Sequence, residues 1–220
     1  HVRSRRQRQM CIRDRSMPIT IAILGYSIAA TIVFTYVGLF GEYAVAGYGS
    51  ATRIEQVVLL PILGINTAII SIIAQNIGAK YYDRVEQSYF TSIKYGLFIM
   101  LIAGVVIFIS ADIVPKFFSS NPEVIMHGSM YLKISAFILP AYPIFFLSNG
   151  FFMALKKSEK AMVNNIARNV IVPVLSFYIA KYLNADFKTF FYIWAIFQWL
   201  ISLILLFYVK YYIKHKLANV

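Results

Sequence analysis

Long apolar runs separated by short polar connections dominate the 220-residue sequence. The clearest run, residues 57–74, is apolar except for Asn66, Thr67 and Ser71, and it is long enough to cross a bilayer of about 30 Å. Lipid offers no partners to unpaired backbone groups, so such a run must be helical. The pattern predicts an all-α membrane protein with six transmembrane helices, at about 18–40, 45–79, 85–110, 121–155, 158–183 and 186–212.

Start and break signals refine these spans. Asn121, Pro122 and Glu123 form a typical helix start, with a cap, a first-turn proline and an acid at the positive end of the helix dipole. We expect helices to kink or break at Pro61, Pro140, Pro143 and Pro173. Two prolines near the middle of span 121–155 free backbone carbonyls, and interrupted helices are the best sequence indication of a transport site.

Composition agrees with a lipid environment, because 60% of the residues are hydrophobic and only 14% are charged. The net charge of +12 is unevenly spread, since residues 1–16 hold six arginines, one aspartate and the single cysteine, Cys11. Lysine, absent from this arm, occurs twelve times in the rest of the chain. We expect residues 1–16 to be a non-native basic arm that resembles sequencing-adapter read-through. The alternative is a juxtamembrane segment attracted to anionic lipid.

Loop charges predict the orientation of the spans. Six crossings place both chain ends on one side of the membrane. The loops on that side contain Lys80, Arg84, Lys156, Lys157, Lys160, Lys210, Lys214 and Lys216, and the opposite loops contain Lys116, Lys181 and Lys188. Because basic loops stay in the cytoplasm, this eight-to-three excess predicts a multi-pass protein of the cytoplasmic membrane with both termini cytoplasmic.

One stretch places small, charged and helix-ending residues at fixed offsets across some forty positions: AVAGYGSATRIEQVVLLPILGINTAIISIIAQNIGAKYYDRV. Its matching elements are Ala44-Val45-Ala46, Arg53-Ile54-Glu55, Pro61, Gly64, Gln75-Asn76 and Gly78-Ala79. With these elements the stretch resembles the multidrug and toxic compound extrusion (MATE) family. The resemblance implies twelve membrane helices in two six-helix lobes, of which this chain would be the second. It also implies a secondary active efflux transporter that exchanges organic cations or drugs for protons or sodium ions.

The coupling ion is expected in the other lobe. The resemblance implies that some MATE members carry ion-binding acidic residues in the first and fourth helices of the second lobe. Here span 18–40 has no acid, and span 121–155 has only Glu123 at its start. We therefore expect the proton or sodium ion to bind in the N-terminal lobe, which this chain lacks.

Two alternative functions stay open. A related flippase for lipid-linked oligosaccharides would favour a strongly cationic cleft for phosphates, and only Lys133 and Arg168 are available for one. A non-transporting membrane scaffold is the other alternative, and the interrupted fourth helix argues against it.

Charges inside membrane spans are expensive and mark candidate functional positions. Four residues qualify for a buried charge network: Arg53, Glu55, Lys133 and Arg168. Arg53 and Glu55 are two positions apart and cannot face each other on a regular helix, so each needs a partner elsewhere. Two roles remain open for these charges, the fixing of helix packing and ion coupling.

Polar and aromatic residues are candidates for the substrate path, namely Tyr26, Tyr36, Asn66, Tyr142 and Asn149. The tyrosine rings would hold a cationic substrate by cation–π contact. Ordinary hydrogen bonding between helices is the competing explanation for these polar groups.

Nothing in the residue pattern indicates catalysis. His1, His127 and His215 fall at ends or loops, no Ser–His pair lies within the membrane spans, and no cluster has metal-ligand spacing. We therefore expect neither an enzyme nor a cofactor, and no nucleic-acid partner. The expected partners are membrane lipid, a small cationic substrate and the N-terminal lobe.

Overall fold

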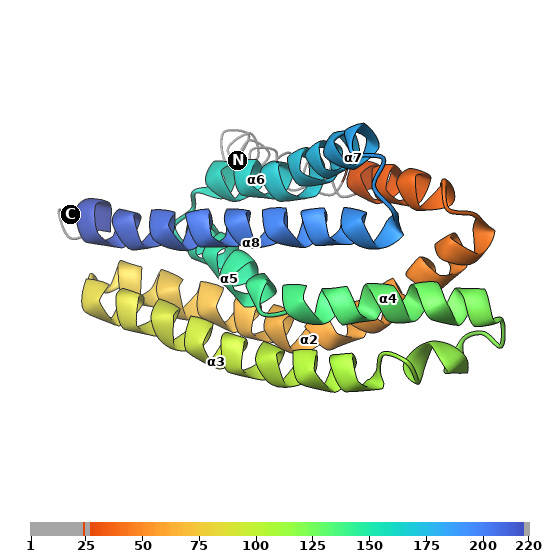
Figure 1. Cartoon of the computed structure of the whole chain (residues 1–220). Helices are drawn as coiled ribbons and strands as arrows, with labels where there is room; N and C mark the ends of the chain where they lie inside the picture. Colours follow the sequence, from red (N-terminus) through yellow and green to blue (C-terminus); the bar gives the residue numbers. More distant parts are fainter. Residues whose placement is uncertain (1–23, 25–26, 218–220) are drawn as a thin grey trace, which may run out of the picture.

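A computed structural model describes residue 24 and residues 27–217 (Figure 1), so Tyr26 and residues 1–16 lie outside the described part. A short helix, Ser27–Gly38, comes first. It is followed by α2 (Glu42–Gly78), α3 (Tyr82–Ser110), the 3-10 turn η1 (Val114–Phe117), α4 (Pro122–Ile138), α5 (Ala141–Ala154), α6 (Ser158–Ile166), the π-helical segment η2 (Ala167–Ile171), α7 (Val172–Tyr182), α8 (Phe187–Tyr212) and the π-helical segment η3 (Ile213–Leu217). The described residues form no strand, which confirms the all-α prediction for this part of the chain.

Four helical stretches among the described residues are long and apolar enough to cross a membrane: α2, α3, Ser158–Tyr182 and Phe187–His215. The pair α4 and α5 is bent by 54° and passes the same test as one broken span. Ser27–Gly38 is apolar but shorter, and most of the preceding residues of the predicted 18–40 span are not described. The predicted six-helix count is therefore approximate.

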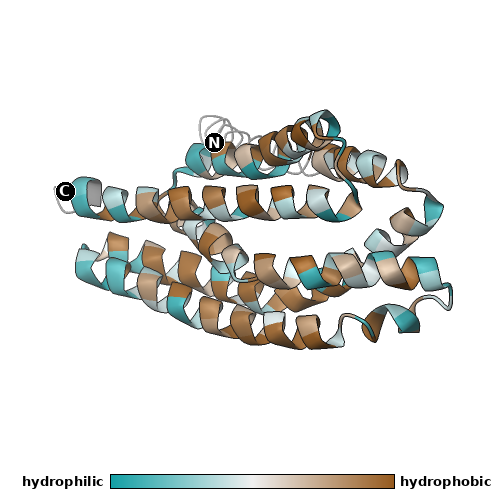
Figure 2. Ribbon diagram, viewed as in Figure 1, coloured by the Kyte–Doolittle hydropathy of each residue, from teal (hydrophilic) through white to brown (hydrophobic). Residues whose placement is uncertain are grey.

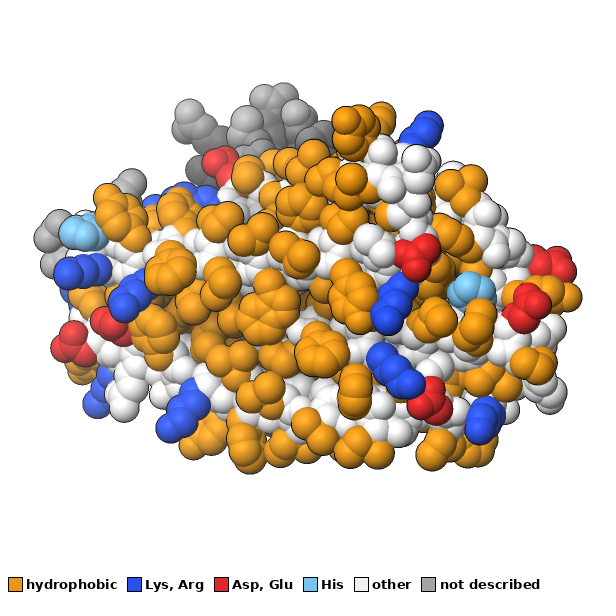
Figure 3. Space-filling model, in the orientation of Figure 1, with side chains coloured by type: hydrophobic (Ala, Val, Ile, Leu, Met, Phe, Trp, Pro, Cys, Tyr) orange, Lys and Arg blue, Asp and Glu red, His pale blue; other side chains and the backbone are white. Residues whose placement is uncertain are grey.

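α5 lies at the centre of the bundle. It contacts α2, α3, α6 and α8, and twelve of its fourteen residues are buried. Hydrophobic residues cover the middle of the helices, and hydrophilic residues gather toward the helix ends (Figure 2). The visible surface follows the same division, with a broad hydrophobic middle (Figure 3). This is the distribution expected of helices that meet lipid along their middle and water at their ends.

Side-chain caps begin two of the helices. The Asn121 side chain accepts a hydrogen bond from the Glu123 backbone N–H at 2.9 Å, and Pro122 occupies the first turn, which confirms the predicted start of α4. At the start of α8, Asp186 accepts a hydrogen bond from the Thr189 backbone N–H at 3.1 Å. Hydrogen bonds from Thr189 hold the pKa of Asp186 below its usual range.

Pro140 separates α4 from α5 and confirms the break predicted there. The Trp199 indole N–H donates to the Phe137 carbonyl at 2.9 Å, and the Ser202 hydroxyl donates to the Ala141 carbonyl at 3.2 Å. Helix α8 thus supplies hydrogen-bond donors to backbone carbonyls on both sides of the break. Such partners are required because lipid cannot provide them.

The other three prolines do not interrupt a helix. Pro61 lies inside α2, which continues through it as one helix, so no break occurs there, and a kink at Pro61 stays a prediction. Pro143 lies in the first turn of α5, where backbone N–H groups have no intrahelical partner in any case, so it costs nothing. Pro173 follows the π-helical segment η2, whose wider turn makes room for the proline ring against the preceding turn.

Glycines allow α2 and α4 to approach closely. A Cβ atom at Gly47 would lie 2.6 Å from the Val124 carbonyl oxygen and 2.9 Å from the Gly128 nitrogen. Both of these are backbone atoms, so neither can move aside without shifting α4. Small residues at helix contacts serve the same purpose throughout membrane proteins.

Gly47→Ala is therefore expected to destabilise the protein by about 1–3 kcal/mol through overpacking. The matched control is Gly64→Ala on the same helix, because a Cβ atom at Gly64 meets nothing within 4 Å. Thermal unfolding of both variants in detergent measures the difference. Equal melting temperatures for the two variants would contradict the close packing of α2 on α4.

Candidate functional site

A cavity of about 190 Å³ lies beside the α4–α5 break and is bordered by α2, α8 and the η2–α7 segment. Its polar lining consists of Thr52, Glu55, Gln56, Tyr131, Tyr142, Arg168, Asn169 and Gln198, and its aromatic lining adds Phe34, Tyr48, Phe146 and Trp194. Ionisable, amide and aromatic side chains from six helical elements, the helix Ser27–Gly38 included, therefore converge at one place.

Glu55 is the buried carboxylate of this cavity, with 6% of its surface exposed. It accepts hydrogen bonds from the hydroxyl groups of Tyr131, on α4, and Tyr142, on α5. On an unbroken helix these two tyrosines would lie on one face but about 16 Å apart along the axis. Both hydroxyl groups reach the one carboxylate, from the two sides of a helix pair that is bent by 54°. The break and the Glu55 site are therefore parts of one arrangement.

Arg168 is the buried cation of the same cavity and belongs to η2. Its Nε donates to Gln198 Oε1 at 2.7 Å, and its guanidinium lies 4.5 Å from the Tyr142 ring and 4.3 Å from the Phe145 ring. Tyr142 thus links the two charges, because its hydroxyl group contacts Glu55 and its ring contacts Arg168. Cation–π contacts of this kind are strongest where the cation is shielded from water.

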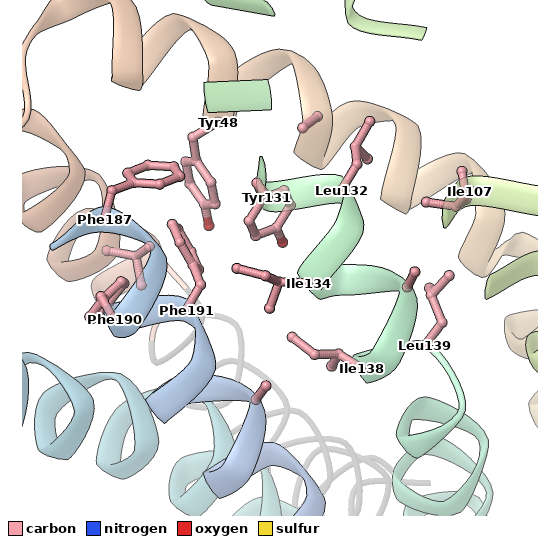
Figure 4. Packing of buried hydrophobic residues seen from close by; sticks show 14 of the residues in the cluster. Tyr48, Ile107, Tyr131, Leu132, Ile134, Ile138, Leu139, Phe187, Phe190 and Phe191 are labelled. Atoms are coloured by element: carbon pink, nitrogen blue, oxygen red, sulfur yellow. The ribbon is translucent and has the colours of Figure 1, made fainter. Parts of the chain in front are cut away.

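Aromatic rings form one wall of the cavity region. The rings of Tyr48, Tyr131 and Phe191, from α2, α4 and α8, face one another with centroid distances of 4.9 to 5.4 Å (Figure 4). The Trp194 indole N–H lines the cavity and has no hydrogen-bond partner among the described residues. Aromatic faces, one carboxylate and one available donor are groups that can bind a small organic cation or a polar molecule.

The predicted charge network divides into separate parts. Arg53 is exposed, so the prediction of its burial is wrong; it is two positions from Glu55 and points to another side of α2. Lys133 forms an ion pair with Asp112 at 2.8 Å, and the two side chains are 41% and 63% exposed. Hydrogen bonds from Lys133 and Ser129 hold the pKa of Asp112 below its usual range. Glu55 and Arg168 are the buried members.

The predicted substrate-path residues are not all at the cavity. Tyr142 lines it, whereas the Tyr36 hydroxyl donates to the Ala185 carbonyl at 2.9 Å and its ring packs 4.2 Å from that of Phe190. Tyr36 therefore connects the helix Ser27–Gly38 to the start of α8. A place for Tyr36 in the substrate path stays a prediction.

Asn66 and Asn149 lie where α2 packs on α5, away from this cavity. Asn149 Oδ1 accepts a hydrogen bond from Asn164 Nδ2 at 3.4 Å. Asn66 Oδ1 and Asn149 Nδ2 are buried and lack a partner among the described residues. Buried polar atoms without a partner are rare, so this contact is a place where a water molecule fits the chemistry. Substrate contact at either residue stays a prediction.

Most of the cavity residues were not predicted from the sequence, among them Tyr131, Trp194 and Gln198. Gln198 had a readable signal, because Gln198 and Ser202 are polar residues four positions apart in a long apolar helix, and both are buried. Tyr131 and Trp194 had none, since aromatic residues make up 16% of the chain. Within residues 27–217, no group of three or more His, Cys, Asp or Glu side chains is placed to hold a metal ion.

Comparison with known proteins gives concordant matches. The MatE family model matches residues 18–178. The chain is 26% identical over 150 residues to the probable multidrug resistance protein YpnP of Bacillus subtilis, covering 68% of this chain and 32% of that protein. It is 24% identical over 160 residues to the multidrug export protein MepA of Staphylococcus haemolyticus, covering 72% and 35%. The chain thus spans about a third of the length of these relatives.

Solved structures share the fold. An outward-facing MATE transporter of the MOP superfamily matches with a TM-score of 0.87 and 21% identity, over 93% of this chain and 46% of that chain. A MOP superfamily transporter from Pyrococcus furiosus matches with a TM-score of 0.86 and 22% identity, over 90% and 45%. The chain therefore has the fold of just under half of each transporter.

Buried and exposed charges should differ in their effect on stability. Arg168→Met is expected to cost roughly 2–4 kcal/mol, because it leaves Gln198 and the buried Glu55 without this neighbour. Lys133→Met should cost under about 1 kcal/mol, since its ion pair is exposed. The stability that the Lys133–Asp112 pair contributes is present at neutral pH, and it is lost as the pH falls through the lowered pKa of Asp112. Melting temperatures in detergent at pH 7 compare the two variants, and equal losses would contradict the division into buried and exposed charges.

Proposed function

Because this chain belongs to the MatE family, whose members are multi-pass membrane transporters, we propose that it forms one six-helix lobe of a secondary active efflux transporter. A second, N-terminal lobe would complete the transport path. The proposal is supported by the coverage of solved transporters, since almost all of this chain matches less than half of each of them. Transport would proceed by alternating access, with the two lobes rocking around a cleft between them.

The proposed substrates are organic cations or drugs. Two relatives are named as multidrug proteins, and the cavity combines aromatic rings with the Glu55 carboxylate. Aromatic faces and a buried acid attract cations of varied shape more readily than they select one molecule. Another relative, from Shewanella oneidensis, is named as an FAD transporter and is 23% identical over 157 residues, so cargo differs among similar chains.

The proposed driving force is the inward movement of protons or sodium ions. The coupling site expected in the N-terminal lobe remains part of the proposal, and we propose Glu55 as a second, additional ion-responsive site in this lobe. For this chain, ion coupling is supported by the buried Glu55 carboxylate. It accepts a hydrogen bond from one tyrosine on each side of the α4–α5 break. Binding of a proton or sodium ion to Glu55 would weaken its hold on Tyr131 and Tyr142. Ion occupancy would thereby change the relative position of α4 and α5, which is the kind of two-state element that coupling requires.

The two alternatives receive less support. A flippase for lipid-linked oligosaccharides would require a cationic cleft, but Lys133 pairs with Asp112 and Arg168 bonds to Gln198, so these cations do not form one together. A scaffold without transport would have no use for a buried acid beside a broken helix and a cavity.

The proposed location is the cytoplasmic membrane, with both chain ends on the cytoplasmic side. The loop joining α2 to α3, the loop joining α5 to α6 and the end of α8 carry most of the basic loop residues. In Figure 1 the α2–α3 turn and the end of α8 lie at the same end of the molecule, which supports an arrangement of six crossings. The positive-inside rule then assigns that end to the cytoplasm.

Glu55→Gln is expected to reduce efflux by about tenfold or more while the transporter still folds, because an amide keeps the shape of the carboxyl group but takes no proton or sodium ion. The assay is drug efflux from cells that express the complete transporter, normalised to the amount of protein in the membrane. The matched control is Glu42→Gln, since Glu42 is an exposed acid in the first turn of the same helix. Its efflux should stay within about twofold of the parent.

Two outcomes would reject the coupling role of Glu55. Normal efflux per molecule combined with a lowered melting temperature would assign Glu55 to helix packing alone. Equal losses in both variants would show that acid removal anywhere on α2 is harmful.

A further inference from the structure

A second cavity, of about 740 Å³, lies at the end of the molecule where α2 turns into α3 and where α8 ends. Its basic side chains are Lys80, Arg84, Lys210 and Lys214, and its acidic ones are Asp83 and Glu86. We refer to this cavity as the basic pocket. It is distinct from the Glu55 cavity, with which it shares no lining residue. Figure 3 shows Lys and Arg side chains toward both ends of the visible face, with Asp and Glu side chains among them.

The position of Arg84 calls for an explanation beyond helix stability. Lysines at the ends of α2 and α8 suit the negative end of a helix dipole, which accounts for Lys80, Lys210 and Lys214. Arg84 instead lies in the first turn of α3, at the positive end of that dipole, where a cation is unfavourable. Its guanidinium lies 5.0 Å from the exposed Tyr81 ring and lines the same pocket as the lysines.

The backbone at Lys80 points the same way. Lys80 has φ of 61°, a left-handed conformation that follows the end of α2, and the next residue's N–H donates to the Asn76 carbonyl at 2.9 Å. Glycine takes this position in many helix ends because other residues are strained there. Lys156 has φ of 58° after α5 and repeats the arrangement. Lysine thus stands at two of the three described non-glycine positions with positive φ, and Asn184 is the third.

The two long helices that contribute to the pocket also expose apolar side chains farther along their length. On α3 these include Tyr95 and Phe98, 11 and 14 residues after Arg84 and therefore on the same face, and on α8 they include Ile204 and Phe207. Val85 and Val209, from α3 and α8, are fully buried in one hydrophobic cluster behind the pocket. Basic side chains at the end of the helices and apolar side chains along them match the two parts of a phospholipid, its phosphate and its acyl chains.

From this combination we propose that the basic pocket binds the headgroup of an anionic phospholipid, with the acyl chains along α3 and α8. In the proposed orientation this lipid belongs to the cytoplasmic leaflet, whose anionic lipids attract basic segments. The site does not depend on the transport function, so lipid binding and efflux can fail separately. A free phosphate would use the basic residues alone and would leave the apolar surface without a role.

The test uses the complete purified transporter in nanodiscs of phosphatidylcholine with about 20% phosphatidylglycerol, an anionic lipid of the kind that basic pockets bind. Native mass spectrometry measures the ratio of the two lipids retained on the protein. The test variant is Lys80→Gln/Arg84→Gln/Lys210→Gln/Lys214→Gln. The control variant is Lys116→Gln/Lys181→Gln/Lys188→Gln, which removes lysines from the opposite end of the bundle, where Lys181 is the basic residue of another cavity. A third variant, Lys80→Arg/Lys210→Arg/Lys214→Arg, keeps every charge.

The parent protein, the control variant and the arginine variant should all retain phosphatidylglycerol preferentially, and the test variant should lose this preference. The expected loss is about fivefold for each basic side chain removed. Melting temperatures verify that the variants compared are folded. If the glutamine variant does not fold, the arginine variant still tests the proposal, because it keeps every positive charge and must keep the preference for phosphatidylglycerol.

Three results would overturn the proposal. The first is a parent protein that retains both lipids in proportion to their supply. The second is an equal loss of the preference in the test and control variants, which would indicate an effect of general surface charge. Displacement of the lipid by inorganic phosphate at equal concentration would identify a free-anion site instead.

Discussion

Lipid cannot form hydrogen bonds with a peptide group, and this constraint governs the centre of the molecule. The break between α4 and α5 exposes backbone carbonyls near the middle of a membrane span, so protein groups must supply the partners. Trp199 and Ser202 of α8 provide two of them. The break is therefore fixed to α8, and the packing of the helices around α5 depends on that attachment.

Glu55 connects the two sides of this break. Tyr131 of α4 and Tyr142 of α5 both direct their hydroxyl groups to its carboxylate. A buried carboxylate without partners would be very costly, so the tyrosines, and Arg168 behind Tyr142, stabilise it in place. Ion binding at Glu55 and helix geometry at Pro140 are thereby linked through two hydrogen bonds. This link is the physical basis of the proposed coupling.

Charge at the two ends of the bundle serves other purposes. The Lys133–Asp112 pair is exposed and contributes little to stability, because water screens it. The basic pocket concentrates positive charge from segments far apart in the sequence, and in the proposed orientation it would lie at the level of the lipid headgroups. Buried charges in this protein therefore act on helix geometry, and the charges at the helix ends act on the surroundings.

The sequence alone determined the class of the protein and much of its fold. Three predictions agree with the structure: the apolar helices, the cap at Asn121 and the helix break at Pro140. They could be made from the sequence because they depend on burial in lipid and on backbone geometry, which are local. The resemblance of residues 44–85 to the MATE family agrees with the family match. Glu55 and Arg168 were singled out because any charge within an apolar span is conspicuous.

Only the tertiary structure decided which residues meet. The partners of Glu55 lie 76 and 87 residues away along the chain, and no local pattern indicates which of many tyrosines will reach it. Arg53 and Lys133 carry the same signal as Arg168, yet they point outward or pair at the surface. Pro61 carries the same signal as Pro140, but its helix continues because neighbouring helices and the remaining hydrogen bonds of a long helix compensate for the one lost. Side-chain direction and contacts between distant helices decide these cases, and both arise only when the helices pack.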